Sequence, residues 1–418
     1  MKITGRYGKF RGPATTLCLL ALGGAALAEG NPYTLGAGIL LGSDDNLFRS
    51  VPGTEVRDSF ATVSVFGGVD QTIGRQRLLA NATLRRSQFQ ELKELNNTGY
   101  NVKLGWNGST EGEVSWGLAY ETNRRLASYG TLVQPQLRVA NLETSNVVQA
   151  NAQLGMRAQW VATLALSHRD IDYSAAQYAG DRVRMDSVGV GVQWNPLGPV
   201  TVSIGPRYTR GRYPQAHIDA NGNDVVDDFV RQDLDFGVRW VASGASTLTA
   251  RLSLTRQRDD VLHERDFDGA TGQLGWQWAV TGKTRFNAAL SRDTGSESSF
   301  ITQSVLGESM RGTGDTSQLT NRVSARIDYE VTSKISMSLG GHYELRRLAA
   351  STTLANGSVS NESGNDRTAS SSLGLRYTPT RNSVLACDIG YQRRGSRTSL
   401  SSPYRVNTAF CSAQLALH

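Results

Sequence analysis

Apolar and polar residues alternate along most of this chain with a period of two. Residues 248–255 place Leu or Ala at every second position with Thr, Arg or Ser between them, and residues 200–207, 285–291, 323–331 and 372–377 follow the same pattern. In residues 323–331 the intervening positions are Ser, Arg, Asp and Glu. A helix would spread these charges around its circumference, whereas a strand places all of them on one side. The alternation therefore predicts a chain built from β-strands.

Two kinds of connection separate the predicted strands, and they alternate along the chain. Tight turns fall near residues 73–75, 107–109, 155–157, 195–198, 243–244, 281–283, 332–334 and 378–380. Longer polar loops fall near residues 44–57, 91–97, 124–141, 172–181, 213–227, 259–265, 295–315, 351–366 and 396–404. Counted along the printed sequence, eight short turns and nine long loops connect eighteen strands, and 16 to 18 is the range that we expect.

Short turns at one end and long loops at the other are typical of a bacterial outer-membrane barrel. A strand in lipid cannot leave its amides unpaired, so the sheet must close on itself. The sequence therefore predicts an all-β fold, a transmembrane antiparallel up-and-down β-barrel with its apolar side toward lipid. The alternative is a large soluble all-β protein, which would pack its apolar faces together and expose the polar ones. The polar faces here are rich in Gly, Ser, Thr, Asn and Gln, which suits a wet lumen.

The first 28 residues have the pattern of a cleaved secretory signal peptide. Its cations are Lys2, Arg6, Lys9 and Arg11, an apolar stretch follows, and Ala26-Leu27-Ala28 is a small-x-small cleavage site. We thus expect a signal peptide at residues 1–28 and a barrel domain at residues 29–418, located in the outer membrane. Without those four cations the formal charge of +7 falls to 40 − 37 = +3, so charge gives no indication of a nucleic-acid partner. After residue 30 there is no run of about 18 apolar residues, which excludes a helical membrane protein.

The polar strand faces supply the candidate pore lining. Its cations would be Lys103, Arg207, Arg239, Arg251, Arg285, Arg322, Arg326 and Arg376, and its anions Asp233, Asp235, Asp328 and Glu330. The planar fork of arginine suits carboxylates and phosphates, so a path for an acidic glycan or another anion is one interpretation. The other is that these side chains pair with one another, Arg239 with Asp235 for example, and stiffen the wall.

The sequence gives no basis for catalysis or for a cofactor. The five histidines are scattered, no Ser/His/Asp constellation or metal-ligand spacing can be assembled, and we therefore predict neither an enzyme nor a metal site. Cys18 would leave with the signal peptide. Cys387 and Cys411 fall on the same face of the last two predicted strands, where they either form a disulfide or serve as two small apolar residues.

One segment carries a resemblance to a known family. The motif consists of Asp44, Asp45, Asn46, Leu47, Phe48 and Arg49. With the hairpin that follows, it resembles the EpsL-type outer-membrane proteins of exopolysaccharide biosynthesis, which accompany exosortase and PEP-CTERM systems. The resemblance covers residues 33–130. Read from the residues themselves, the motif would brace the end of the first strand, with its carboxylates accepting backbone N–H bonds or pairing with Arg49.

The resemblance implies a monomeric barrel that helps carry a newly made polysaccharide across the outer membrane. Its partners would be outer-membrane lipid, the polysaccharide cargo and periplasmic polysaccharide export machinery. Two alternatives remain open at this point. One is a general or anion-preferring diffusion porin. The other is a non-transporting anchor or assembly protein whose external loops, such as residues 295–315, bind the matrix.

Overall fold

The computed structural model describes residues 32–129, 140–155, 159–196, 198–218, 223–294, 317–353 and 359–417. The predicted signal peptide and the predicted loop at residues 295–315 lie outside these ranges, so both stay predictions.

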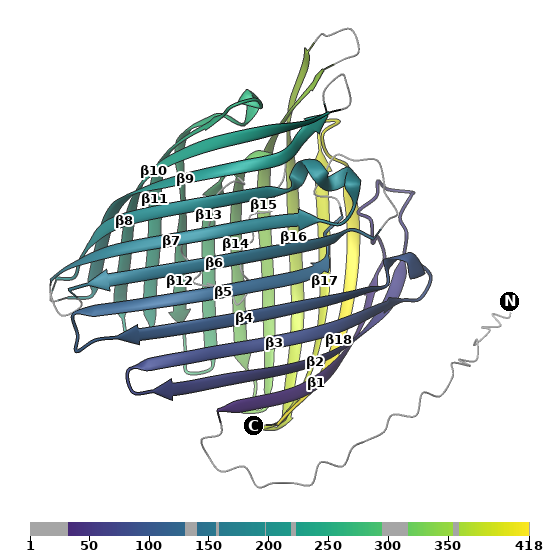
Figure 1. The fold of residues 1–418 in the computed structure, drawn as a ribbon. Coiled ribbons are helices and arrows are strands. Elements are labelled where there is room, and N and C mark those ends of the chain that lie inside the picture. Colours follow the sequence, from purple (N-terminus) through teal and green to yellow (C-terminus); the bar gives the residue numbers. More distant parts are fainter. Residues whose placement is uncertain are drawn as a thin grey trace. The chain divides into compact units, whose positions relative to one another are not determined.

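Within the described part of the chain, eighteen strands form one antiparallel sheet that closes into a barrel (Figure 1). Each strand pairs with its neighbours in sequence, and β1 also pairs with β18, from Leu35 opposite Leu417 to Asp44 opposite Thr408. This pairing removes both free sheet edges, as a strand wall in hydrocarbon requires. The predicted fold class and the count of eighteen strands are confirmed.

The strands are β1 (Tyr33–Asp44), β2 (Asp58–Ile73), β3 (Gln76–Phe89), β4 (Asn97–Ser109), β5 (Val114–Leu126), β6 (Leu142–Leu154), β7 (Trp160–Tyr173), β8 (Val183–Trp194), β9 (Val200–Ile218), β10 (Asp224–Ser243), β11 (Ser246–Asp259), β12 (Phe267–Ala279), β13 (Thr284–Asp293), β14 (Ser317–Glu330), β15 (Ile335–Thr353), β16 (Val359–Thr380), β17 (Ser383–Ser396) and β18 (Tyr404–Leu417). Three short 3₁₀ helices, η1 (Lys93–Leu95), η2 (Ala176–Asp181) and η3 (His263–Arg265), lie in connections at the long-loop end. We call this the outer end and the short-turn end the periplasmic end.

Four predicted connections are mostly strand, and these predictions were wrong in their boundaries. Residues 107–109 belong to β4, and residues 378–380 belong to β16. The loops expected at 213–227 and 351–366 are largely occupied by the outer ends of strands. Apolar alternation ends where a strand leaves the hydrocarbon, but backbone pairing continues beyond that level, as between Ile218 and Asp224. The pattern therefore underestimates the strand length outside the membrane.

The two sides of the barrel wall differ as the alternation predicts. On β11, Leu252 and Leu254 are 51% and 53% exposed, whereas the alternate residues Ser253 and Thr255 are buried. An exposed apolar side on a closed barrel is the surface that faces lipid, and the other side faces the lumen. The protein is therefore an outer-membrane barrel. No helix among the described residues is long and apolar enough to cross a membrane.

Aromatic side chains mark the two borders of the apolar belt. Exposed tryptophans lie near the periplasmic ends of their strands: Trp106, Trp160, Trp194, Trp240 and Trp278. Exposed Tyr391 lies toward the outer end of β17. Such girdles form at the membrane interfaces because the ring is apolar and its polar group needs water.

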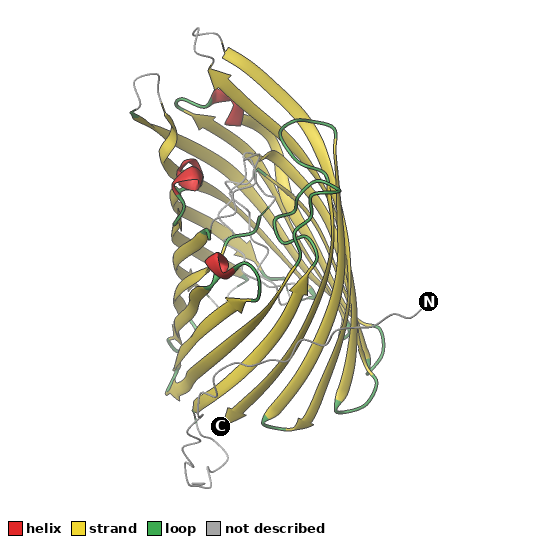
Figure 2. Cartoon of the chain, turned by 90° about the vertical axis from the view of Figure 1, so that its right-hand side faces the viewer, coloured by secondary structure: helices red, strands yellow, loops and turns green. Residues whose placement is uncertain are grey.

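The outer end also contains small apolar cores. Phe48, Phe89 and Leu95 form one cluster of buried residues. A second cluster joins the ends of β7, β8 and β10 with η2, and includes Tyr173, Tyr178 and Phe229. Figure 2 shows the inclined strands of the wall together with the short helices and loops. These clusters hold connections against the barrel wall at its outer end.

Candidate functional site

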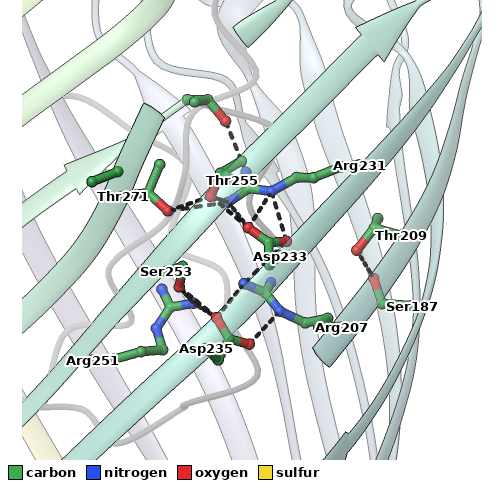
Figure 3. A network of polar contacts seen from close by, with 12 residues as sticks. Ser187, Arg207, Thr209, Arg231, Asp233, Asp235, Arg251, Ser253, Thr255 and Thr271 are labelled. Atoms are coloured by element: carbon green, nitrogen blue, oxygen red, sulfur yellow. Dashed lines mark hydrogen bonds and ion pairs between the residues drawn. The ribbon is translucent and has the colours of Figure 1, made fainter. Parts of the chain in front are cut away.

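Successive lumen-facing positions of β10 carry Arg231, Asp233 and Asp235 (Figure 3). Arg207 of β9 is the register partner of Asp233 on one side, and Thr255 of β11 is its partner on the other. Side chains at directly opposed positions on one face have Cβ atoms about 4.5–5.5 Å apart. Three neighbouring strands thus bring their charged and hydroxyl side chains into one network.

Arg231 and Asp233 form a fully buried ion pair, with both side chains 0% exposed. The Arg231 Nε atom lies 3.1 and 3.0 Å from the two carboxylate oxygens, and its Nη2 atom lies 3.0 Å from Oδ1. Thr255 donates a hydrogen bond of 2.6 Å to the same carboxylate. Arg231 Nη1 donates to the Thr294 hydroxyl at 2.8 Å. A buried charge requires such partners because it has lost its water.

Asp235 forms a second, less deeply buried set of contacts toward the periplasmic side. Arg207 Nε lies 2.9 Å from Asp235 Oδ2 and also reaches Asp233, at 3.3 Å from Nη2 to Oδ2. Arg251 Nη1 lies 3.7 Å from Asp235 Oδ1, and Ser253 donates a hydrogen bond to that oxygen. Partners therefore bind both carboxylates, and the arginines of this network are themselves buried, with side-chain exposures of 3% for Arg207, 0% for Arg231 and 12% for Arg251.

The other predicted lining residues also lie at lumen-facing positions of their strands. Ion pairs join Lys103 to Glu121 at 3.2 Å, Arg285 to Glu330 at 3.1 Å, Arg326 to Asp328 at 2.9 Å, and Arg322 to Glu344. Arg239 and Arg376 are exposed on this side of the wall and have no ion pair among the described residues. The expected pairing of Arg239 with Asp235 is wrong. The two residues lie four positions apart on one strand, about 14 Å at 3.4 Å per residue, whereas Arg207 and Arg251 lie on adjacent strands.

Sequence reasoning missed a second buried network on β15 to β17. Arg346 Nη2 lies 2.6 Å from Asp366 Oδ2, and Arg394 Nε lies 3.7 Å from the same oxygen. Glu344 also approaches Arg346, at 3.8 Å. These residues lie in the outer parts of their strands, where apolar and polar residues no longer alternate clearly. The sequence pattern therefore does not indicate there which side chains face the lumen. Arg231 was missed for the same reason.

The motif after β1 braces the connection to β2. Arg49 Nη1 lies 2.8 Å from Asp44 Oδ2, and the backbone N–H of Asn46 donates to Asp44 Oδ1 at 2.9 Å. Asn46 is 0% exposed, and its amide donates to the carbonyl oxygens of Ser50 and Arg405, each at 2.9 Å. Both kinds of contact expected from the motif are present. In addition, the hydrogen bond from the Asn46 amide to Arg405 links the loop to β18.

Asp45 adds a further link to β18, because its carboxylate accepts hydrogen bonds from the Asn407 backbone at 2.7 Å and side chain at 2.6 Å. Leu47 and Phe48 of the same motif pack into the apolar cluster around Leu95. The whole motif therefore stabilises the outer end of the seam between the first and last strands.

Cys387 and Cys411 are register partners on β17 and β18, and the structure joins them in a disulfide. They share the strand face of exposed Leu385 and Leu415, so the bridge lies on the lipid-facing side. His168 also lies on the outer face, where its Nδ1 atom is 2.7 Å from Asp186 Oδ1. Among the described residues, no group of three or more His, Cys, Asp or Glu side chains could hold a metal ion.

The outer part of β11 extends beyond the hydrocarbon. Its outward-facing side chains change from Leu252 and Leu254 to Arg256 and Arg258. Arg258 forms an ion pair with Asp268 of the adjacent strand. Charged outward positions are costly inside the apolar belt, so the end of this strand lies above the membrane.

Asp259 is the last residue of β11 and is only 2% exposed. Its Oδ2 atom accepts a hydrogen bond of 2.8 Å from Gln257, whereas its Oδ1 atom has no hydrogen-bond partner among the described residues. Burial raises the pKa of this carboxyl to about 7, and the nearby carboxylate of Asp227 acts in the same direction. The hydrogen bond from Gln257 lowers the pKa, but by less than burial raises it. Asp259 can therefore change its charge near neutral pH.

Comparison with known proteins identifies no family. No family model matches the chain, and no curated protein matches it. Among solved structures, the outer membrane protein OpdK from Pseudomonas aeruginosa is similar, with 14% identity, a TM-score of 0.47, and coverage of 92% of this chain and 99% of that one. OccK3 (OpdO) from the same organism has 13% identity, a TM-score of 0.46 and coverage of 92% and 96%. The siderophore receptor PirA from Acinetobacter baumannii has 8% identity, a TM-score of 0.45 and coverage of 92% and 80%. The description of the fold rests on the strand pairing of this chain and not on these likenesses.

Proposed function

We propose that this barrel is an anion-preferring diffusion channel of the outer membrane. The observation that carries the proposal is that Arg239 and Arg376 are exposed on the lumen side of the wall and have no ion pair among the described residues. Both lie toward the periplasmic ends of their strands, β10 and β16.

Exposed lumen-side arginines offer an anion several contacts. Besides Arg239 and Arg376, Arg285 is 69% exposed at its side chain, although Glu330 forms an ion pair with it. Each guanidinium presents a fork of donors that fits carboxylate or phosphate oxygens. Several weak sites in series favour entry without holding the solute tightly, as conduction requires.

The test is ion selectivity of the purified barrel in a planar bilayer under a tenfold KCl gradient. We expect a steady conductance. We also expect a reversal potential whose sign shows that chloride crosses the barrel more readily than potassium. The variant Arg239→Gln/Arg376→Gln should move the reversal potential toward zero, because two exposed lumen cations are lost without leaving a buried acid unpaired. The matched control is Arg184→Gln/Arg212→Gln, which removes two arginines from the outer face. Cation preference in the unaltered barrel, or an equal change in the control, would contradict the proposal.

Export of an exopolysaccharide is a second proposal, and the resemblance of residues 33–130 to EpsL-type proteins supports it. We rank it below the diffusion channel because its support is the motif at residues 44–49, which in this structure braces the seam. Deletion of the gene separates the two. An export conduit predicts loss of surface polymer with intact uptake of small solutes, and a diffusion channel predicts the reverse.

A further inference from the structure

Four arginines form a row on the outward side of the barrel, at the outer ends of β15 to β18. They are Arg347, Arg367, Arg393 and Arg405, and all four are exposed. Arg393 and Arg405 are direct register partners. Arg393 also pairs with Ala369, and Arg367 lies two residues before Ala369 on the same face of β16. Likewise, Arg367 pairs with Leu345, and Arg347 lies two residues after Leu345 on the same face of β15. We call these four residues the outer arginine row.

The outer arginine row is separate from the lumen network on the same strands. Arg346 and Arg394 are buried and bound to Asp366, so they point inward. Their chain neighbours Arg347 and Arg393 must therefore point to the opposite side, because successive residues of a strand alternate. Exposed Tyr391, two positions before Arg393, confirms the outward direction of this parity.

No ion pair joins a carboxylate to the outer arginine row in the part of the chain that the structure describes. This is in contrast to outward arginines on another part of the wall. There, Arg184 lies 3.3 Å from Asp170, and Arg212 lies 2.6 Å from Asp228.

The carboxylate beside the row, Asp45, is bound to the side chain and backbone of Asn407. Like charges at directly opposed strand positions destabilise a sheet. The opposed pair Arg393 and Arg405 is therefore a site that an external anion would stabilise.

An open groove of about 430 Å³ lies on the same outward surface, directly below the row. Apolar side chains line its membrane side: Leu339, Leu373, Ile389, Tyr391 and Ala409. Ser43, Asp45, Arg57 and Asn407 line it at the level nearer the outer end. The register explains this division, since Leu373, Ile389 and Ala409 are consecutive cross-strand partners inside the belt. Cationic groups thus lie immediately above an apolar groove at the membrane interface.

We propose that this face binds a phosphorylated glycolipid of the outer leaflet, with its phosphate on the outer arginine row and an acyl chain in the groove. The charge of the row fits a phosphate, which arginine holds through paired N–H donors. The level of the row fits a headgroup, because Tyr391 marks the interface just below it. The groove continues the apolar belt, so an acyl chain reaches it without leaving the membrane.

The test uses the full barrel purified in a neutral detergent, with lipid A, phosphatidylcholine and inorganic phosphate as separate probes. Bound lipid is counted by native mass spectrometry, and affinity is measured from the shift of the urea unfolding midpoint on titration. We expect lipid A to bind the unaltered barrel at least tenfold more tightly than phosphatidylcholine. Arg393→Gln/Arg405→Gln should lose at least tenfold in lipid A affinity, and the control Arg184→Gln/Arg212→Gln should lose none.

A second measurement covers the case of a misfolded variant. Without lipid, Arg393→Gln/Arg405→Gln should unfold at the same urea concentration as the unaltered barrel or a higher one, because the repulsion between the two arginines is gone. A lower midpoint without lipid would show that the arginines have a structural partner and would overturn the proposal. Equal lipid A affinity in the variant and the parent, equal affinity for phosphatidylcholine, or a midpoint shift that inorganic phosphate alone reproduces would also overturn it.

Discussion

Asp233 is the lumen residue whose removal should cost the barrel most stability. It is 0% exposed at its side chain, and Arg231, Arg207 and Thr255 all contact it. Replacement by Leu removes the carboxylate from a buried guanidinium. Two unit charges about 4 Å apart attract by about 4 kcal/mol at an effective dielectric constant near 20. This agrees with the loss of about 3–5 kcal/mol seen when one partner of a buried pair is removed.

A compensating change tests whether the unpaired charge is the cause. In Asp233→Leu/Arg231→Met one positive and one negative charge are lost together, and Arg207 keeps Asp235 at 2.9 Å. Replacing a complete buried pair by apolar residues is often close to neutral. We therefore expect the double variant to be more stable than Asp233→Leu alone by about 1–3 kcal/mol, within the usual range for coupled residues.

The measurement is urea unfolding of the refolded barrel in lipid vesicles, followed by tryptophan fluorescence and by the mobility of unheated samples on gels. Asp388→Leu is the control, because Asp388 is an exposed lumen-side carboxylate without an ion pair among the described residues. The control should change the free energy of unfolding by less than about 1 kcal/mol. If Asp233→Leu behaves like the control, or if the double variant is no more stable than the single one, the reasoning about the buried pair is wrong.

Three further predictions concern the outer end and the seam. Because burial raises the pKa of Asp259 to about 7 from 3.8, the folded barrel keeps a proton that the unfolded chain releases above about pH 4. Its unfolding free energy should therefore fall by up to about 4 kcal/mol as the pH rises from about 4 to 7, and urea titrations of Asp259→Asn should lack this slope. Replacement of both Cys387 and Cys411 by Ala should lower the unfolding free energy by about 3–4 kcal/mol, as expected for a loop with a sequence separation of 24. Urea titrations with and without reductant check this, and free thiols in the unreduced parent would contradict it. Asn46→Ala leaves buried backbone groups without partners, at about 1–3 kcal/mol each, so limited trypsin digestion should cut after Arg49 at least tenfold faster than in the parent, whereas an unchanged rate would show that the loop is held by other contacts.

The barrel itself could be predicted because lipid imposes a strict rule on one strand face. Outward positions in the belt must be apolar, so apolar residues recur at every second position of a strand, as at residues 248–255. Turn residues then divide the strands, and Gly74, with a positive φ of 59°, shows why a glycine marks the turn between β2 and β3. Outside the belt this rule no longer applies, which is why the outer ends of β9, β10, β15 and β16 were read as loops.

The lumen contacts could be predicted only in part. The alternation along β10 places Asp233 and Asp235 on the lumen side, but which residue forms an ion pair with them depends on the register between strands. Arg207 lies opposite Asp233 only because β9 and β10 pair as they do. The sequence predicts a long loop at residues 213–227 between these strands, so no tight turn fixes that register in advance. The pairing of Cys387 with Cys411 was easier, because both lie at similar distances from the same loop.

The contacts of Asn46 and Asp45 have a consequence for the order in which this protein can mature. Their partners Arg405 and Asn407 lie 359 and 362 residues away in the chain. These bonds cannot form until nearly the entire polypeptide has been delivered to the membrane, so they report that synthesis and secretion are complete. A chain cut short before β18 would leave a buried asparagine amide without its acceptor at an open rim, and cellular quality control could distinguish such an unfinished product from the sealed one.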